Sequence, residues 1–209
     1  DDLRWLTDRM FESLLKTPSL TALAVKGFQA DAPDVEVASV NAEDAPAHDQ
    51  DYARIGSSGY YAQIGSSGDY ARIGSSGDYA QIGSSGDAAR IGSSGDAAQI
   101  GSSGDAARIG SSGDYAQIGS SGNYAQIGSS GYYARIGSSG YSAQINAEGA
   151  RAVIASAGLN ARVRAGEEGA VAVAYHDGNR IRFAVGYVGE NLKALTWYSV
   201  NDAGEFVEV

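Results

Sequence analysis

The sequence has no cysteine, one methionine and three prolines among its 209 residues. The absence of cysteine excludes a disulfide scaffold, a cysteine-ligated zinc site and a thiol nucleophile. No apolar run reaches the ~20 residues that a transmembrane helix needs, and the first residues do not resemble a secretory signal. We therefore expect a cytoplasmic protein with no membrane partner. Basic residues are also scarce, and a net charge of −10 argues against direct binding of nucleic acid.

Glycine, in contrast, is abundant, with 29 residues, and much of it belongs to a nine-residue repeat. The repeat reads Asp-Tyr-Ala-Arg-Ile-Gly-Ser-Ser-Gly at residues 51–59, and it recurs with little change up to residue 140. Two degenerate copies follow at 141–149 and 150–158. The nine positions of each repeat are counted from the residue equivalent to Asp51, which is position one. Such a short, fixed period is typical of a solenoid.

The repeat has the pattern of a short strand followed by a turn. Ala53 and Ile55 are two residues apart, so on a strand they share one face, whereas Tyr52 and Arg54 point to the other. Gly-Ser-Ser-Gly then forms a turn, in which glycine can adopt a positive φ. Glycine and serine tracts are often disordered, but a flexible linker would not need the regularly spaced alanine and isoleucine. We predict an all-β fold, a β-solenoid (β-helix or β-roll) of nonapeptide repeats.

The size of one coil is indicated by position four, which alternates between arginine and glutamine up to Gln117. This alternation favours a coil made of two repeats. Such a coil stacks arginines in a like-charge column, which is unfavourable unless Asp51 and its equivalents compensate the charge. Three repeats per coil would mix the two residue types in each column, and this alternative stays open because the alternation breaks at Gln126 and Arg135.

The flanking segments are predicted to cap the solenoid. Residues 1–17 have the apolar spacing of an amphipathic helix, residues 35–40 alternate as a strand does, and residues 42–50 form an acidic connector. Such caps protect the core and the strand edges of the end coils.

At the other end, residues 171–175 and 181–187 flank an Asp-Gly turn and indicate a β-hairpin. A second hairpin is predicted from residues 196–200 and 205–209. The predicted organisation is therefore an N-terminal helix with a capping and linker segment (1–50), a nonapeptide-repeat solenoid (51–158), and degenerate repeats with a C-terminal β-hairpin cap (159–209).

The sequence contains little that indicates catalysis. Its two histidines are His48 in the acidic connector and His176 beside Asp177 in a predicted turn. The repeated serines are equivalent to one another, whereas a catalytic triad needs one specially placed serine with a base beside it. We expect no enzymatic activity, no catalytic residue and no cofactor.

Calcium is the one ion that the repeat suggests. Calcium-binding β-rolls also use nine-residue repeats, G-G-x-G-x-D-x-U-x. In this chain the second glycine of that pattern is absent, and aspartate stands one position too early. A calcium-stabilised, secreted β-roll is therefore kept as an alternative, beside the simpler interpretation that Asp51 and its equivalents cap the turns or pair with arginine.

Tyrosines at position two are the candidate partner-binding residues, because exposed rows of aromatic rings are suited to contact a partner. Their alternative role is to stack on each other and stabilise neighbouring coils. The candidates are Tyr52, Tyr61, Tyr70, Tyr79, Tyr115, Tyr124 and Tyr133.

These features predict a non-enzymatic binding or scaffold protein that presents a rigid, repetitive outer face with tyrosine rows to a protein partner. Oligomers could form through the N-terminal helix or a solenoid end. An inhibitor that mimics DNA is a further alternative, which the low net charge of the repeats argues against, since residues 51–145 hold seven aspartates and five arginines.

The C-terminal sequence resembles a known group of proteins. Thr196-Trp197-Tyr198 and the ending Gly-Glu-Phe-Val-Glu-Val at 204–209 are similar to the end of uncharacterised bacterial and prophage-encoded repeat proteins, which carry Gly-Asp-Tyr/Ala repeats before a small β cap. The resemblance covers about residues 51–209. It implies a repeat domain with a β cap and no site residues, because the function of that group is unknown.

Overall fold

The computed structural model describes residues 36–39 and 51–209, which form strands connected by short turns. The repeat strands are β2 (Arg54–Ser57), β3 (Gln63–Ser66), β4 (Arg72–Ser75), β5 (Gln81–Ser84), β6 (Arg90–Ser93), β7 (Gln99–Ser102), β8 (Arg108–Ser111), β9 (Gln117–Ser120), β10 (Gln126–Ser129) and β11 (Arg135–Ser138). The flanking strands are β1 (Glu36–Ser39), β12 (Gln144–Ala147), β13 (Val153–Ser156), β14 (Arg162–Ala165), β15 (Ala170–His176), β16 (Ile181–Tyr187), β17 (Tyr198–Val200) and β18 (Phe206–Glu208).

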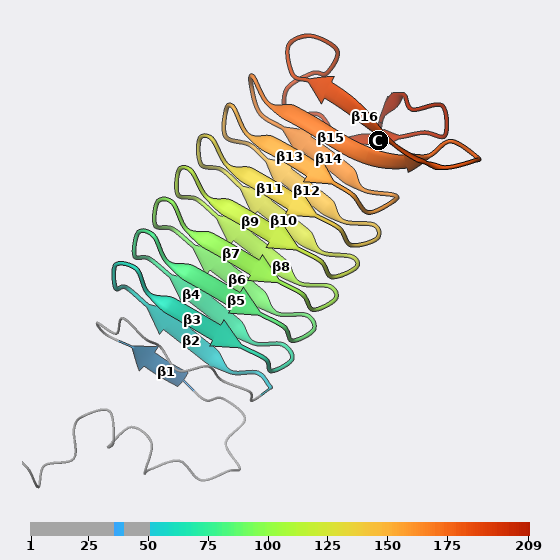
Figure 1. Ribbon diagram of the computed structural model, residues 1–209. Helices are drawn as coiled ribbons and strands as arrows, with labels where there is room; N and C mark the ends of the chain where they lie inside the picture. Colours follow the sequence, from blue (N-terminus) through green and yellow to red (C-terminus); the bar gives the residue numbers. More distant parts are fainter. Residues whose placement is uncertain (1–35, 40–50) are drawn as a thin grey trace, which may run out of the picture. The chain divides into compact units, whose positions relative to one another are not determined.

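The strands wind into a β-solenoid whose coils stack one on another (Figure 1). Each coil holds two strands, one in each of two sheets. Sheet A has the order β1-β2-β4-β6-β8-β10-β12-β14-β17-β18, and sheet B has the order β16-β15-β13-β11-β9-β7-β5-β3. Each repeat strand pairs in parallel with the next strand but one along the chain, as Ile55 of β2 does with Ile73 of β4. Two repeats per coil are therefore confirmed, and the three-repeat alternative is wrong.

The core consists of identical layers. Alanine at position three and isoleucine at position five are buried in every repeat, as predicted. The serine at position seven is also buried, because the strand extends from position four to position seven. The expectation that Gly-Ser-Ser-Gly forms the turn is therefore wrong for its first two residues, which belong to the strand and continue its in–out alternation.

The turns differ from the sequence expectation in a second way. Positive φ occurs at position two, with values from 53° to 61° between Tyr52 and Tyr133, and not at the glycines of the repeats. The glycine at position nine is needed for another reason, which is close backbone approach between coils. A Cβ atom on Gly113 would lie 2.0 Å from the carbonyl oxygen of Gly95.

The strand predicted at residues 35–40 is confirmed as β1, which pairs in parallel with β2 and places Glu36 beside Arg54. These two residues are separated by the length of two repeats, so β1 continues the period of the solenoid. The predicted amphipathic helix at 1–17 and the connector at 42–50 lie outside the described residues. Within the described part of the chain, no helix is long and apolar enough to cross a membrane.

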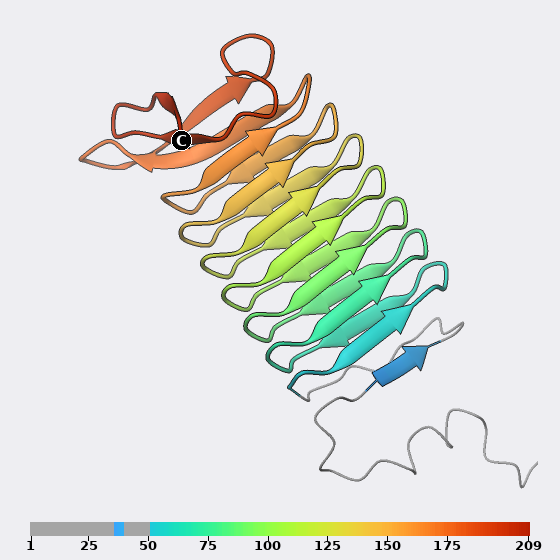
Figure 2. The same ribbon diagram turned by 180° about the vertical axis from the view of Figure 1, so that it is seen from behind.

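Two antiparallel hairpins form the C-terminal cap, as predicted. Strands β15 and β16 form the first and end sheet B, whereas β17 and β18 form the second and end sheet A (Figure 2). The ring of Tyr198 packs edge-on against Phe206, and Leu192 is 6% exposed. These apolar side chains cover the alanine and isoleucine core of the last coil.

Candidate functional site

The two sheets expose different side chains at position four. On sheet A the residues at this position form an in-register column, which we call the arginine row: Arg54, Arg72, Arg90 and Arg108. On sheet B the equivalent column contains Gln63, Gln81, Gln99 and Gln117. Adjacent strands lie about 4.8 Å apart, so the arginine row presents cationic groups at this interval. Over these strands, position four is therefore basic on sheet A and neutral on sheet B, and the glutamine column of sheet B ends at Arg135.

A shallow trough runs along one side of the arginine row. Its floor is formed by position-six glycines, such as Gly74 and Gly92, which have no side chain to fill the space. The trough has a volume of about 1010 Å³, and Trp197 from the C-terminal cap lines it together with Gln144 and Asn146. It gives an elongated ligand a flat surface beside the arginine side chains.

A smaller hollow of about 310 Å³ lies on the opposite side of the row, at the edge where the chain turns into sheet A. It is lined by the four arginines together with Tyr52, Tyr70, Ala88 and Ala106. Tyr52 and Tyr70 stack with their ring centroids 5.1 Å apart, and the following alanines lack rings. We call this hollow with the arginine row the arginine–tyrosine edge.

The structure distributes the seven candidate tyrosines over two opposite edges. The turns that precede sheet A carry Tyr52, Tyr70 and Tyr124, and the turns that precede sheet B carry Tyr61, Tyr79, Tyr115 and Tyr133. The seven are between 37% and 62% exposed. They lie in the turns, in the positive-φ position, and not on the outer face of a strand as expected. A single partner surface on one edge therefore includes only one of the two sets.

Several tyrosines stack on the equivalent tyrosine of the next coil, so part of their role is to stabilise the packing between coils. Tyr61 stacks on Tyr79 at 5.0 Å, and Tyr115 stacks on Tyr133 at 5.2 Å. Arg151 continues the second column, because its guanidinium lies 5.6 Å from the ring centroid of Tyr133 and also pairs with Glu168. Arg151 also donates a hydrogen bond to the Tyr133 hydroxyl, and the pKa of Arg151 is raised by its hydrogen bond to Glu168 first and by the bond to Tyr133 second.

The aspartates at position one connect successive coils. The backbone N–H of Asp87 donates to Oδ1 of Asp69, and that of Asp105 donates to Oδ1 of Asp87, both at 2.8 Å. Asn123 replaces aspartate in the same column, and its Oδ1 accepts the backbone N–H of Tyr141 at 2.9 Å. An amide therefore makes the same contact as a carboxylate. This geometry supports the interpretation that these residues cap turns.

We expect calcium to leave the thermal stability unchanged, because the Oδ1 atoms of the stacked aspartates already accept backbone hydrogen bonds. A ligand that binds only the folded state would raise the melting midpoint. The measurement compares thermal melts in EDTA and in millimolar calcium, with the Asp96→Asn variant as the control for the carboxylate. A calcium-dependent rise in the midpoint that Asp96→Asn reduces would contradict this expectation and favour the β-roll alternative.

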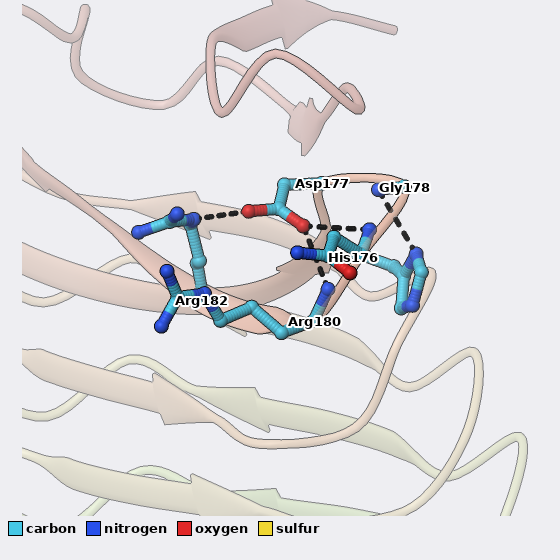
Figure 3. Close-up of polar contacts among 6 residues, drawn as sticks. His176, Asp177, Gly178, Arg180 and Arg182 are labelled. Carbon is cyan, nitrogen blue, oxygen red and sulfur yellow. Dashed lines mark hydrogen bonds and ion pairs between the residues drawn. The ribbon is translucent and has the colours of Figure 1, made fainter.

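His176 is the last residue of β15, and not part of the turn as predicted, whereas Asp177 begins the turn to β16; both side chains accept hydrogen bonds from the backbone of the turn (Figure 3). Nδ1 of His176 accepts the N–H of Gly178 at 3.1 Å, and Oδ1 of Asp177 accepts the N–H of Arg180 at 2.7 Å. The carboxylate of Asp177 also pairs with Arg182, and this contact holds the pKa of Asp177 well below its usual range. These contacts support a role of the His176-Asp177 pair in stabilising the turn.

The alternation at position four predicted both the size of a coil and, for two repeats per coil, a column of stacked arginines. With two repeats per coil, the same alternation places all the early arginines on one sheet and all the early glutamines on the other. The arginine–tyrosine edge was therefore implied by the pattern. Within the described ranges, no group of three or more histidine, cysteine, aspartate or glutamate side chains could hold a metal ion.

Comparison with known proteins finds a similarity to an uncharacterised bacterial protein over part of the chain. No protein family model matches it. A stretch of 44 residues, 21% of the chain, is 50% identical to the uncharacterized protein YdhT of Escherichia coli (strain K12), and it spans 16% of that protein's length. No solved structure matches. The chain is a β-solenoid repeat protein that is similar, over about a fifth of its length, to an uncharacterised bacterial protein.

Proposed function

We propose that the protein is a non-enzymatic binding or scaffold protein whose arginine–tyrosine edge recognises a partner protein that carries carboxylate groups. The observation that carries this proposal is the 310 Å³ hollow, in which the arginine row and the Tyr52–Tyr70 stack line the same surface. Guanidinium groups form strong, charge-assisted hydrogen bonds with carboxylates. Tyrosine adds apolar contact area and a hydroxyl group at a low cost in side-chain entropy.

The rigidity of the solenoid also supports a binding function. Each coil is fixed by backbone hydrogen bonds to its neighbours, such as the bond from the N–H of Arg90 to the carbonyl oxygen of Ala71 at 2.8 Å. A partner therefore meets side chains whose backbone positions are already ordered, which lowers the entropic cost of binding. The proposal includes a bacterial or prophage origin, because the repeats and the C-terminal sequence resemble those of prophage-encoded repeat proteins with a small β cap.

The test is an affinity capture from bacterial lysate with the intact chain and two matched variants. Tyr52→Ala/Tyr70→Ala removes the stack beside the arginine row, whereas Tyr61→Ala/Tyr79→Ala removes an equivalent stack from the opposite edge. We expect a partner captured by the intact chain to be lost, by tenfold or more, only with the first variant. Alanine already stands at position two in Ala88, Ala97 and Ala106, so both variants keep the fold.

The charge contribution is tested with Arg72→Gln/Arg90→Gln, since glutamine occupies the same row at Gln126 and Gln144. We expect this variant to weaken capture, and we expect Arg135→Gln on sheet B to leave it unchanged. Binding through the row should also weaken as salt screens the charges. Equal capture by all the variants would contradict the proposal, and competition with duplex DNA for a captured DNA-binding protein would favour the DNA-mimic alternative.

A further inference from the structure

Strand β16 has an exposed row of apolar side chains. Ile181, Phe183, Val185 and Tyr187 alternate along the strand and are between 48% and 58% exposed. They lie on the outer side of sheet B, because Ala184 and Gly186 between them face the core. Natural sheets protect their edges with charges, prolines, bulges or very short strands. Strand β16 is seven residues long, contains no proline and has Arg182 as its one charged residue, so it is well suited to pair with another strand.

The backbone of β16 has free hydrogen-bonding groups on its outer edge. The N–H of Val188 donates to the carbonyl oxygen of Gly169, so the even-numbered residues face β15. The carbonyl of Tyr187 points the other way and accepts the N–H of Leu192. Because these directions alternate along an antiparallel strand, the N–H and C=O groups of Ile181, Phe183 and Val185 point outward. Within the described part of the chain, no strand pairs with this edge.

We propose that two copies of the chain associate through β16, as an antiparallel pair of identical strands related by a two-fold axis at Phe183. This contact is distinct from the arginine–tyrosine edge. The centre of the strand pair follows from the outward backbone groups that are free. Tyr187 is not among them, since its N–H already donates to Oδ1 of Asn191 at 2.7 Å. Centring the pair on Phe183 places Ile181 opposite Val185 of the second copy, and all three residues then exchange N–H···O bonds with the other strand.

The side chains fit this register. Phe183 lies opposite its own copy and Ile181 lies opposite Val185, so each outer-face cross-strand pair is apolar, which stabilises an antiparallel pair. Arg182 lies opposite Ala184 of the other strand, so the register brings no like charges face to face. Charge also selects the antiparallel direction, because Arg180 precedes the strand and Glu190 follows it. Parallel pairing would place the two Arg180 side chains side by side.

The mass in solution is measured by sedimentation of the full chain over a concentration series. We expect twice the 21.5 kDa of one chain. Phe183→Lys should give a monomer, because lysine on an edge strand opposes pairing. Val153→Lys is the matched control, since Val153 is 48% exposed on the outer face of the same sheet but lies in the interior strand β13. It should keep the dimer.

Further variants test the register and distinguish loss of the dimer from misfolding of the chain. Val185→Pro removes an N–H that is free in the single chain and bonded in the dimer, so it should give a folded monomer. The chain has no cysteine, and Phe183→Cys should therefore form a disulfide-linked dimer on oxidation, whereas Ile181→Cys should not. A monomer at every concentration, or a dimer that all these variants keep, would overturn the proposal.

Discussion

Gly113→Ala is expected to lower the free energy of unfolding by about 3 kcal/mol or more, near the upper end of the range for overpacked sites. The added Cβ would lie 2.0 Å from the carbonyl oxygen of Gly95 and 2.9 Å from the backbone nitrogen of Asp96. Both atoms belong to the backbone of the preceding coil, so no side-chain rotation can relieve the overlap. Two neighbouring coils must move apart, which weakens the hydrogen bonds between them.

Thermal melting checks this expectation, and we expect the midpoint to fall by about 10 °C. The matched control is Gly110→Ala, because Gly110 occupies position six of the same repeat and a Cβ there would meet no atom within 4 Å. Alanine at that position should be neutral or stabilise the strand by about 0.5 kcal/mol, since glycine loses more backbone entropy on folding. Equal midpoints for the two variants would show that the coils separate at little cost.

These glycines show what the sequence can and cannot predict about the turns. The repeat, with alanine and isoleucine two residues apart, was sufficient to predict a β-solenoid and its alanine and isoleucine core. The alternation of arginine and glutamine at position four favoured a coil of two repeats but left three repeats open. The conformation of the turn was not predictable, because glycine is common both where φ is positive and where two backbones come close. In this fold the second requirement applies at Gly113, and Tyr115 adopts the positive φ instead.

The candidate site was predictable only in part, for a related reason. Exposure of the position-two tyrosines follows from the single repeat, because the core needs only positions three and five. Which tyrosines share a surface depends on the number of repeats per coil, and that number separates Tyr52 from Tyr61. The same number places Arg72 beside Arg90. The single repeat therefore shows which side chains are exposed, whereas the number of repeats per coil determines which of these side chains lie together in the site.

The buried serines at position seven provide a second prediction with a large effect. Ser93, Ser111 and Ser129 stack in one column, and among the described residues no group accepts or donates a hydrogen bond to the Oγ atoms. Equivalent residues in adjacent coils lie about 4.8 Å apart, which exceeds hydrogen-bonding distance. A buried hydroxyl without a partner costs about 1 to 3 kcal/mol. The column itself continues with Ala147 and Ala165, so alanine fits this position.

The triple variant Ser93→Ala/Ser111→Ala/Ser129→Ala is therefore expected to raise the free energy of unfolding by about 3 kcal/mol, and the melting midpoint by about 10 °C. The control replaces the exposed serines that follow them, Ser94, Ser112 and Ser130, and should change stability by no more than about 0.5 kcal/mol at each site. A lower midpoint for the first variant would show that the hydroxyls take part in hydrogen bonds along the column. A higher midpoint would mean that the repeat keeps its serines at a cost in stability.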